Sequence, residues 1–505
     1  MLSHRDVDQL MSKNPTFEDI ICSLPYGPQL PKAMINETKV VIAMARKFND
    51  EVVRPRALEL DRRTHEDPDY LPWELVEEAN RRNLYSIGIP KLFGGRGYNL
   101  PALSHLLEEL SSECVGIANV VGVHYLGVAG ICASGNTRLC NKIFRDVRRG
   151  EKTGEPCIIS LAITEPSAGT DVEDVELIDR GNIRCHAKKV KGGYIVNGTK
   201  VFISMGHVST WCMLVAYGEL KKPGDTVVSM MVKTGTKGFS FGRHENKMGQ
   251  RVCPASELVF EDCFIPDENV LVDPCQADTF PKSYRDFHSK YLDYVLCITR
   301  PAVCAFATGV ARGAYERAVK FASETEVNGE LLINQEWAQS MLAEMYRNIF
   351  LSRLAYVEGN YANGLYGMYG LLQQKFIYYY LKYTPQICID IFTSPFLNMK
   401  FSTRIMRSIY FNQSSRDQQF SSGLASLAKI TGTDTGVKVS QMALEMMGQA
   451  GLRQDQGAEK FLRDSKLLQI YEGTNQLNRL SLFKNHIGRL YDQVKMFEEG
   501  DHNVG

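Results

Sequence analysis

Hydrophobic residues recur along the chain with two different periods. Between residues 36 and 154 they return every three or four positions, as in Val41, Met44 and Phe48, which is typical of amphipathic helices. From about residue 155 the apolar runs become short and are bounded by turn residues, which predicts strands. Helical spacing returns from residue 284. The pattern predicts an extension followed by helical, β and helical domains, which we place at 1–35, 36–154, 155–283 and 284–505.

The clearest turn signal in the β domain is the dipeptide Asn197-Gly198. Apolar runs lie on both sides of it, at 194–196 and 201–203. Because Asn-Gly favours the backbone of a two-residue turn, we expect a tight hairpin here. Further strands are expected at 227–232 and 258–260, in a domain of antiparallel type.

An unusual segment interrupts the helices of the C-terminal domain. Helices are expected at 284–323, 331–361, 424–448, 456–468 and 475–495. Residues 362–423, between the second and third of them, are rich in Phe and Tyr, and Asp390 is the one acid between 371 and 411, against five cations. Three interpretations stay open: core packing or a subunit contact, a cover over an acyl pocket, or a basic and aromatic surface for a membrane or an electron-acceptor protein.

Composition narrows the class of protein. The 505 residues carry 58 Lys and Arg against 58 Asp and Glu, so the formal net charge is zero. A protein that binds nucleic acid over much of its surface needs an excess of basic residues, so we do not expect this function. No run of 18 apolar residues lacks charge, so no spanning helix is expected, and the polar N-terminus is unlike a secretory signal. Thirteen cysteines form no Cys-x-x-Cys pair. We therefore expect reduced thiols, no metal site and a cytoplasmic protein.

Candidate chemistry comes from three stretches, because Rossmann, Walker and nucleophile-elbow motifs are missing from the sequence. The first stretch is Ile163–Asp171, where Thr164, Ser167 and Thr170 offer hydroxyls. Its backbone N–H groups could face an electron-rich heterocycle or a phosphate. An ordinary surface turn capped by Asp171 explains the same residues equally well.

The second stretch is Asn197–Ser204. Phe202 and Ser204 are two positions apart and so share one face of a strand. A flat cofactor ring could pack on Phe202 and accept a hydrogen bond from Ser204. Taken alone, a core Phe beside a solvent-facing Ser is the simpler interpretation.

The third stretch is Ile470–Gln476, in which Glu472 precedes Gly473 between two expected helices. A carboxylate desolvated on such a turn would have a raised pKa and would be a better base. Taken alone, an exposed Glu that stabilises a helix N-terminus is the simpler interpretation.

In this order and architecture, the three stretches resemble the acyl-CoA dehydrogenase family. The resemblance covers about 36–361 and 424–490, and it is most specific in Ile163–Asp171, Tyr194–Gly206, Lys247–Arg251 with Val259–Leu271, and Phe461–Gln476 with its continuation to Ile487. It implies an α+β fold with an N-terminal helical domain, a middle antiparallel β domain and a C-terminal four-helix bundle, assembled as a homodimer or homotetramer. It also implies FAD as the cofactor, an acyl-CoA substrate and an electron-transfer flavoprotein as the electron acceptor.

The resemblance assigns roles to individual residues. Glu472 stands where the family has the base that removes the α-proton while hydride leaves Cβ for flavin N5, and its backbone N–H should polarise the thioester carbonyl. A subset of the family carries the base on an earlier helix, and the matching position here follows Thr299 and is Arg300. Residues expected at the cofactor are Leu161, Ile163, Thr164, Gly169, Thr170, Phe202, Ile203, Ser204, Gly448, Gln449, Thr474 and Gln476. Residues expected at the substrate are Thr170, Thr299, Arg300, Tyr471 and Gly473.

Three departures from the family fall where its FAD contact crosses between subunits. Thr325–Gly329 replaces Arg-x-x-Phe-Gly, Glu336 replaces a Gln, and Glu445–Gln449 replaces Gln-x-x-Gly-Gly. Loss of the Arg removes a charge-assisted phosphate contact, which puts the binding of the ADP half and the tetramer contact in question. Two other functions stay open: an acyl-CoA oxidase that uses dioxygen, and a non-catalytic assembly or scaffold member of the family.

Overall fold

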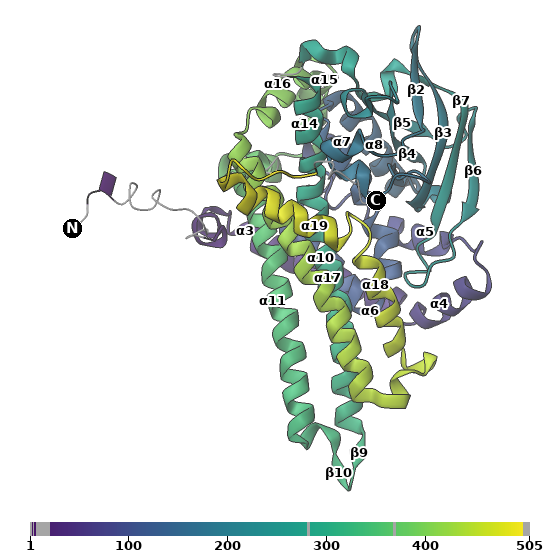
Figure 1. The fold of residues 1–505 in the computed structure, drawn as a ribbon, viewed down its shortest axis with the longest axis vertical. Coiled ribbons are helices and arrows are strands. Elements are labelled where there is room, and N and C mark those ends of the chain that lie inside the picture. Colours follow the sequence, from purple (N-terminus) through teal and green to yellow (C-terminus); the bar gives the residue numbers. More distant parts are fainter. Residues whose placement is uncertain (1–2, 4, 7–20, 280–282, 367–369, 498–505) are drawn as a thin grey trace, which may run out of the picture.

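Long helices run along one side of the molecule and a twisted sheet lies on the other (Figure 1). This computed structural model describes residues 3, 5–6, 21–279, 283–366 and 370–497. Much of the expected extension at 1–35 lies outside the described residues.

The N-terminal helices surround α6, which is buried along nearly its whole length. Asn99 begins α6 by accepting a hydrogen bond from the Ala102 N–H at 2.9 Å, and Asn136 begins α8 by accepting one from the Leu139 N–H at 3.2 Å. Their bounds are α2 Ser23–Tyr26, α3 Ala33–Phe48, α4 Ala57–Glu66, α5 Trp73–Arg81, α6 Leu100–Gly122, α7 His124–Ala133 and α8 Thr137–Thr153.

The middle domain is a sheet with the strand order β6-β7-β3-β2-β4-β5-β8, and β1 lies beside β4. Within the described residues the pairings are antiparallel, except that β1 and β2 both run parallel to β4. The strands are β1 Ile159–Ala162, β2 His186–Val190, β3 Gly193–Ser204, β4 Trp211–Tyr217, β5 Val227–Lys233, β6 Phe239–His244, β7 Ala255–Pro266 and β8 Val270–Val272. The short α9, Val175–Ile178, lies between β1 and β2.

The expected hairpin at Asn197-Gly198 is wrong, because both residues lie inside the single strand β3. The turn comes earlier, between Val190 and Gly193, which face each other across β2 and β3. Gly198 sits at an irregularity in the pairing with β7, with φ +146°, and a Cβ there would lie 2.6 Å from the Cys185 Cα. The glycine therefore marks a close approach of two backbones within the sheet and not a chain reversal.

The C-terminal domain is a bundle built on α10 Tyr284–Glu324, α11 Glu336–Tyr366 and α17 Ser415–Gly451, followed by α18 Ala458–Leu468 and α19 Asn475–Leu482. The hairpin of β9 Glu326–Val327 and β10 Glu330–Leu331 joins α10 to α11, so the second helix begins later than expected. By length and composition, α10 and the bent pair α6 and α7 could each cross a membrane. The apolar window of α10 is 94% buried in the molecule, as in the core helix of a bundle.

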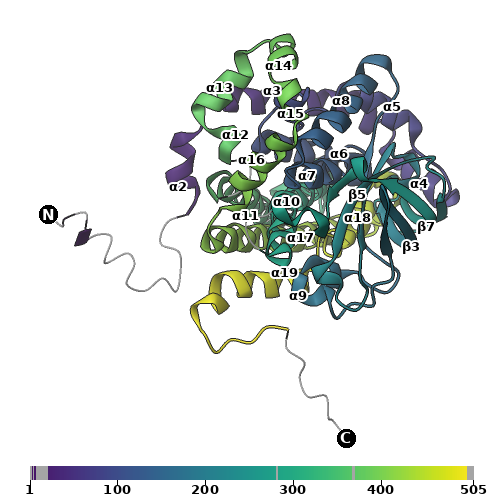
Figure 2. The same ribbon diagram turned by 90° about the horizontal axis from the view of Figure 1, so that it is seen from above.

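The described part of the segment 362–423 is helical and is not a solvated loop. It contains α12 Gly370–Gln373, α13 Lys375–Tyr383, α14 Gln386–Phe392, α15 Ser394–Leu397 and α16 Lys400–Phe411. α15 and α16 contact α8, so this insertion covers the N-terminal domain at one end of the molecule. Viewed from above, α13 and α14 lie well away from β3 and β7 (Figure 2).

Candidate active site

Glu472 lies on a tight turn between α18 and α19. Its φ is +57° and that of Gly473 is +78°, so two consecutive residues are left-handed. A left-handed Glu costs about 1–2 kcal/mol, so the surrounding structure must hold it. Arg300 Nε and Asn478 Nδ2 donate to the Glu472 carbonyl, at 3.4 and 3.3 Å. Lys429 Nζ and Asn478 Nδ2 donate to the Gly473 carbonyl, at 2.7 and 2.9 Å.

The Glu472 carboxylate is held from α10. Thr299 Oγ1 donates a hydrogen bond to Glu472 Oε2. Burial raises the pKa of Glu472, while the Thr299 hydrogen bond and the charges of Arg300 and Lys429 act in the opposite direction. The side chain is thus a desolvated carboxylate with a fixed orientation and not an exposed group at a helix end.

Two buried cations and a second carboxyl lie around the same turn. Arg300 Nη1 donates to Ser426 Oγ at 3.0 Å, and Arg300 Nη2 is 3.6 Å from Glu173 Oε2. Lys429 Nζ also donates to Asn475 Oδ1 at 2.7 Å. Burial lowers the pKa of Lys429 to about 7 and raises the pKa of Glu173 to about 7. Arg300, expected at the substrate, therefore has its guanidinium engaged with protein groups that support the turn.

The first and third stretches of the sequence meet at this turn. Glu173 ends the 3-10 helix Thr170–Glu173, whose first two residues are the last two of the stretch Ile163–Asp171. A Cβ at Gly473 would lie 2.6 Å from Glu173 Oε2, so a side chain at this position would have to displace the Glu173 carboxyl. The contact brings the hydroxyl-bearing loop of the β domain against the turn that carries Glu472.

Residues of the second stretch, on strand β3, bond the loop of the first stretch and hold it in place. Lys200 Nζ donates to the Ile163 carbonyl and to Glu165 Oε1, both at 2.9 Å, and the Lys200 and Glu165 side chains are buried. The Val201 N–H donates to the Thr164 carbonyl at 3.0 Å. A buried ion pair therefore fixes the loop whose hydroxyls were expected to meet the cofactor.

Phe202 is not a core residue. It is 59% exposed, with φ +59°, and it lies at a register shift between Lys200 and Ile203, whose side chain is buried. Ser204 is partly exposed on the same strand. An exposed aromatic ring with the Thr164 loop and a serine beside it fits a flat heterocycle that offers hydrogen-bonding atoms at its rim.

Leu161, Gly169 and Thr170 frame the same loop. Leu161 lies on β1, which ends at Ala162, directly before the loop begins. A Cβ at Gly169 would meet no atom within 4 Å, so the space beside the loop is open, and Thr170 is partly exposed. The loop thus has room for a ligand along its outer side.

Gly448 and Gln449 are not brought to this site. They are exposed near the end of α17, and Gly448 is fourteen residues beyond Asp434, which bonds Asn475 next to the turn. That separation along a helix is roughly 20 Å. Thr474 lies nearer, since its side chain accepts a hydrogen bond from the Leu477 N–H and begins α19, and Gln476 is exposed in the first turn of that helix.

Three residues at the site were not singled out from the sequence. The local sequence pattern does not distinguish Glu173 or Lys429 from ordinary helical residues. A single Lys in the apolar run before Gly432 is nevertheless a signal that could have identified Lys429. Gln250 joins the three domains: it bonds the Asp464 carbonyl through Nε2 at 2.9 Å, and its Oε1 accepts from Asn119 Nδ2 at 2.6 Å and from the Tyr471 hydroxyl at 3.4 Å. This bonding gives a physical reason for the specific sequence Lys247–Arg251.

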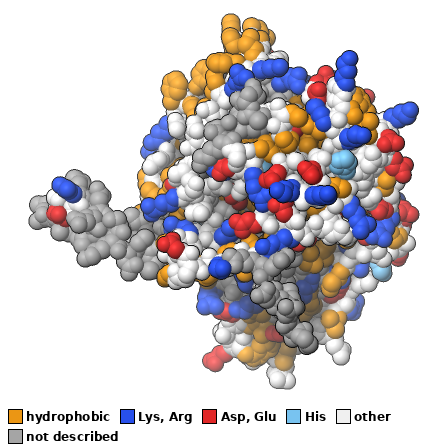
Figure 3. All heavy atoms as spheres, turned by 45° about the horizontal axis from the view of Figure 1, so that its top comes forward, with side chains coloured by type: hydrophobic (Ala, Val, Ile, Leu, Met, Phe, Trp, Pro, Cys, Tyr) orange, Lys and Arg blue, Asp and Glu red, His pale blue; other side chains and the backbone are white. Residues whose placement is uncertain are grey.

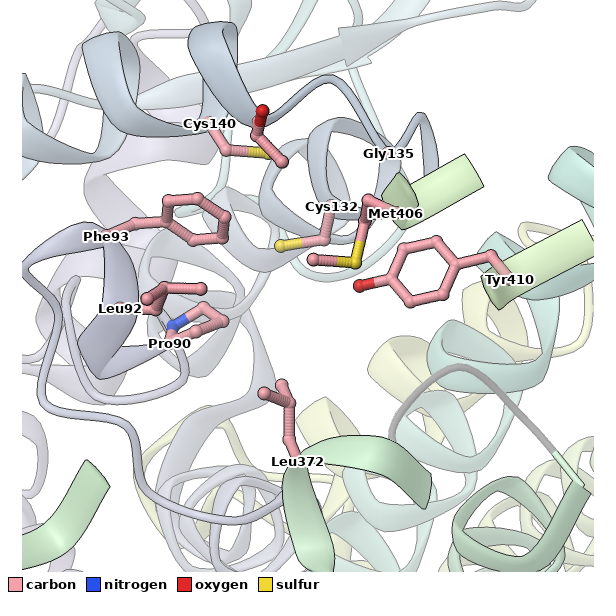
Figure 4. Close-up of a pocket in the computed structure, with 10 residues that line it drawn as sticks. Pro90, Leu92, Phe93, Cys132, Gly135, Cys140, Leu372, Met406 and Tyr410 are labelled. Carbon is pink, nitrogen blue, oxygen red and sulfur yellow. The ribbon is translucent and has the colours of Figure 1, made fainter. Parts of the chain in front are cut away.

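A separate apolar pocket lies between the insertion and the N-terminal domain (Figure 4). Leu372, Met406 and Tyr410 of the insertion face Phe93 and Cys132 across it (Figure 4). Its lining includes none of the residues expected at the cofactor or the substrate.

Comparison with known proteins agrees with this arrangement. The N-terminal, middle and C-terminal domains of the acyl-CoA dehydrogenases match residues 36–151, 160–263, and 290–359 with 393–486. Cyclohex-1-ene-1-carbonyl-CoA dehydrogenase of Syntrophus aciditrophicus (strain SB) is 28% identical over 451 residues, which are 88% of this chain and 89% of that protein.

Two solved structures share the fold. Butyryl-CoA dehydrogenase of Megasphaera elsdenii is 21% identical with a TM-score of 0.67, covering 89% of this chain and 97% of that chain. A structure described as electron transferring flavoprotein of Acidaminococcus fermentans is 24% identical with a TM-score of 0.68, over the same shares of the two chains. The expected fold class is confirmed. The chain belongs to the acyl-CoA dehydrogenases, FAD-dependent oxidoreductases that act on acyl-CoA thioesters.

Proposed function

We propose that the protein converts an acyl-CoA thioester to the trans-2-enoyl-CoA, with Glu472 as the base that takes the α-proton. The observation that carries this proposal is the Glu472 turn, where a desolvated carboxylate is oriented by Thr299. Desolvation makes the carboxylate a stronger base, and a fixed orientation lowers the entropy cost of proton transfer. The backbone N–H of Glu472 is proposed to polarise the thioester carbonyl as negative charge develops there.

Bound FAD would supply the acceptor for the β-hydride. Ile163, Thr164, Phe202 and Ser204 are proposed to hold its ring, because they offer an exposed aromatic face and hydrogen-bonding groups in one place. Leu161, Gly169, Thr170 and Ile203 shape that surface, and Thr474 and Gln476 border it. Thr170, Tyr471 and Gly473 are proposed to line the thioester site, with Arg300 in a positioning role.

Gly448 and Gln449 would reach cofactor only in another subunit, so we propose a homodimer or homotetramer. An exposed apolar stripe on α11 suits such a contact, and its members are Trp337, Tyr346, Phe350, Leu351 and Leu354. We further propose an electron-transfer flavoprotein as the acceptor and a cytoplasmic location, since all thirteen cysteines are free, as a reducing compartment requires.

The test uses purified, FAD-loaded protein mixed without oxygen with short, medium, long, branched and cyclic acyl-CoA esters. Bleaching of the visible flavin band by at least one ester is expected, and reduced enzyme should pass its electrons to an electron-transfer flavoprotein. A flavin that no ester bleaches would overturn the proposal. Stoichiometric peroxide from reduced enzyme in air would instead identify an oxidase.

A further inference from the structure

The insertion turns its hydrophobic side chains outward. Between Lys375 and Phe411, eleven large apolar residues are exposed, and Phe376 is the most exposed at 83%. They are Phe376, Tyr380, Tyr383, Ile387, Ile391, Phe392, Phe396, Met399, Phe401, Ile405 and Ile409. Hydrophobic side chains protrude at this end of the molecule, with Lys and Arg side chains close by (Figure 3). Apolar patches of this kind on a folded protein mark interaction sites.

The inner side of the same helices combines buried apolar residues, such as Ile389 and Leu397, with buried polar contacts. Arg407 is buried and donates to the Ser134 and Leu271 carbonyls, at 3.1 and 2.8 Å. Lys91 Nζ donates to the Lys382 and Thr384 carbonyls, at 2.9 and 2.8 Å. The helices are therefore anchored through polar contacts, and the outward apolar face is fixed by the fold.

Charge on the outer face has one sign. Asp390 is the one acid between 371 and 411, and it pairs with Arg145 at 2.7 Å. Lys382 pairs with Glu37 at 2.9 Å. The charged residues exposed there are Lys375, Lys400 and Arg404, all of them cations.

Cations and apolar residues are interleaved on α16. Phe401, Ile405 and Ile409 follow each other at four-residue spacing and form one row. Lys400 and Arg404 form the adjoining row. Side chains that are apolar in the middle and cationic at the margin are what an anionic lipid surface binds.

We propose that the outer face of α13–α16 binds the surface of an anionic lipid bilayer and makes the protein a peripheral membrane protein. The apolar side chains enter the headgroup boundary, and Lys375, Lys400 and Arg404 lie near the lipid phosphates. A second copy of the chain fits this face less well than a lipid surface does, because contact between two such faces would bring like charges together. The stripe on α11, at a distance from α13–α16, already offers an apolar contact between copies (Figure 1).

The test sediments FAD-loaded full-length protein with vesicles of phosphatidylcholine, with and without phosphatidylserine. Wild type should sediment with the anionic vesicles, less with the neutral ones, and less as salt rises. The double variant Phe376→Ser, Phe401→Ser should lower binding by about tenfold or more. Lys375→Gln with Lys400→Gln should lower it by about tenfold on anionic vesicles only.

A matched control removes exposed apolar groups from the β domain, in Leu220→Ser with Phe264→Ser, and should bind vesicles like wild type. Unchanged melting temperatures show that the variants fold. Wild type that stays in solution with both vesicle types overturns the proposal, as does a Phe376 and Phe401 variant that binds normally. If those two substitutions instead reduce the molar mass in light scattering while wild type ignores vesicles, the face joins copies of the chain and the proposal is wrong. None of these readouts depends on dehydrogenase activity.

Discussion

Thr299 Oγ1 on α10 donates a hydrogen bond to the Glu472 carboxylate, although the two residues are 173 positions apart in the chain. The bond crosses from one helix of the bundle to the turn between two others. It stabilises the charged form of Glu472, while burial favours the neutral form. The balance between burial on one side and this bond with the charges of Arg300 and Lys429 on the other sets the pH at which the carboxylate becomes an active base.

Replacing Thr299 with Val should shift the pH dependence of activity. Loss of the hydrogen bond raises the pKa of Glu472 further, so more of the enzyme is protonated and inactive at a given pH. The acid limb of the kcat/KM profile should therefore move to higher pH. Thr299→Ser keeps a hydroxyl and should leave the limb near its original place. Identical profiles for all three enzymes would show that the bond does not tune Glu472.

Glu173 should make the protein less stable as pH rises. Burial raises its pKa to about 7 from 4.5, so between these values the folded protein holds a proton that the unfolded chain has lost. Stability from this group is complete below about pH 4.5 and is lost as pH rises through about 7. Between pH 5 and pH 8, this group should lower the unfolding free energy of wild type by roughly 2–3 kcal/mol. Glu173→Gln should lack that drop, which is checked by measuring the unfolding free energy of both proteins at the two pH values. The exposed Glu176→Gln serves as the control, and an equal effect there would contradict the assignment.

Lys200 should be essential for the stability of the β domain. Lys200→Met removes the cation that pairs with Glu165 and leaves a buried carboxylate without compensation. This should lower the unfolding free energy by about 3–5 kcal/mol. The double variant Lys200→Met, Glu165→Gln removes the uncompensated charge and should recover part of that loss. Thermal unfolding of the three proteins measures this. A double variant less stable than Lys200→Met would mean that the loop depends on the Glu165 carboxylate itself.

The sequence was sufficient for the order of domains, because the change from helical to strand period is strong at residue 155 and again near 284. It was not sufficient for β3, where Asn197-Gly198 has the local preference of a turn. Pairing with β2 and β7 on both sides overrides that preference, and Gly198 is needed for its close approach to Cys185. Turn propensity is local, whereas strand pairing depends on residues distant in sequence.

At the site too, local sequence predicts some features, whereas long-range packing decides others. Glu472 could be proposed from its stretch and its resemblance, but Thr299, Lys429 and Glu173 converge on it from other elements. Their meeting depends on how α10, α17 and the β domain pack, which no single stretch encodes. The insertion is the opposite case: its aromatic and basic composition was plain in the sequence, but which side chains face outward is set by anchors such as Arg407.

The most direct measurement is stopped-flow flavin reduction, without oxygen, of wild type and Glu472→Gln by the ester that bleaches wild type fastest. The variant should retain FAD and should bind the ester, since glutamine keeps the size of the side chain. Without the carboxylate base, its rate of bleaching should fall by about a thousandfold or more. Bleaching of Glu472→Gln at the wild-type rate would contradict the assignment of Glu472 as the base.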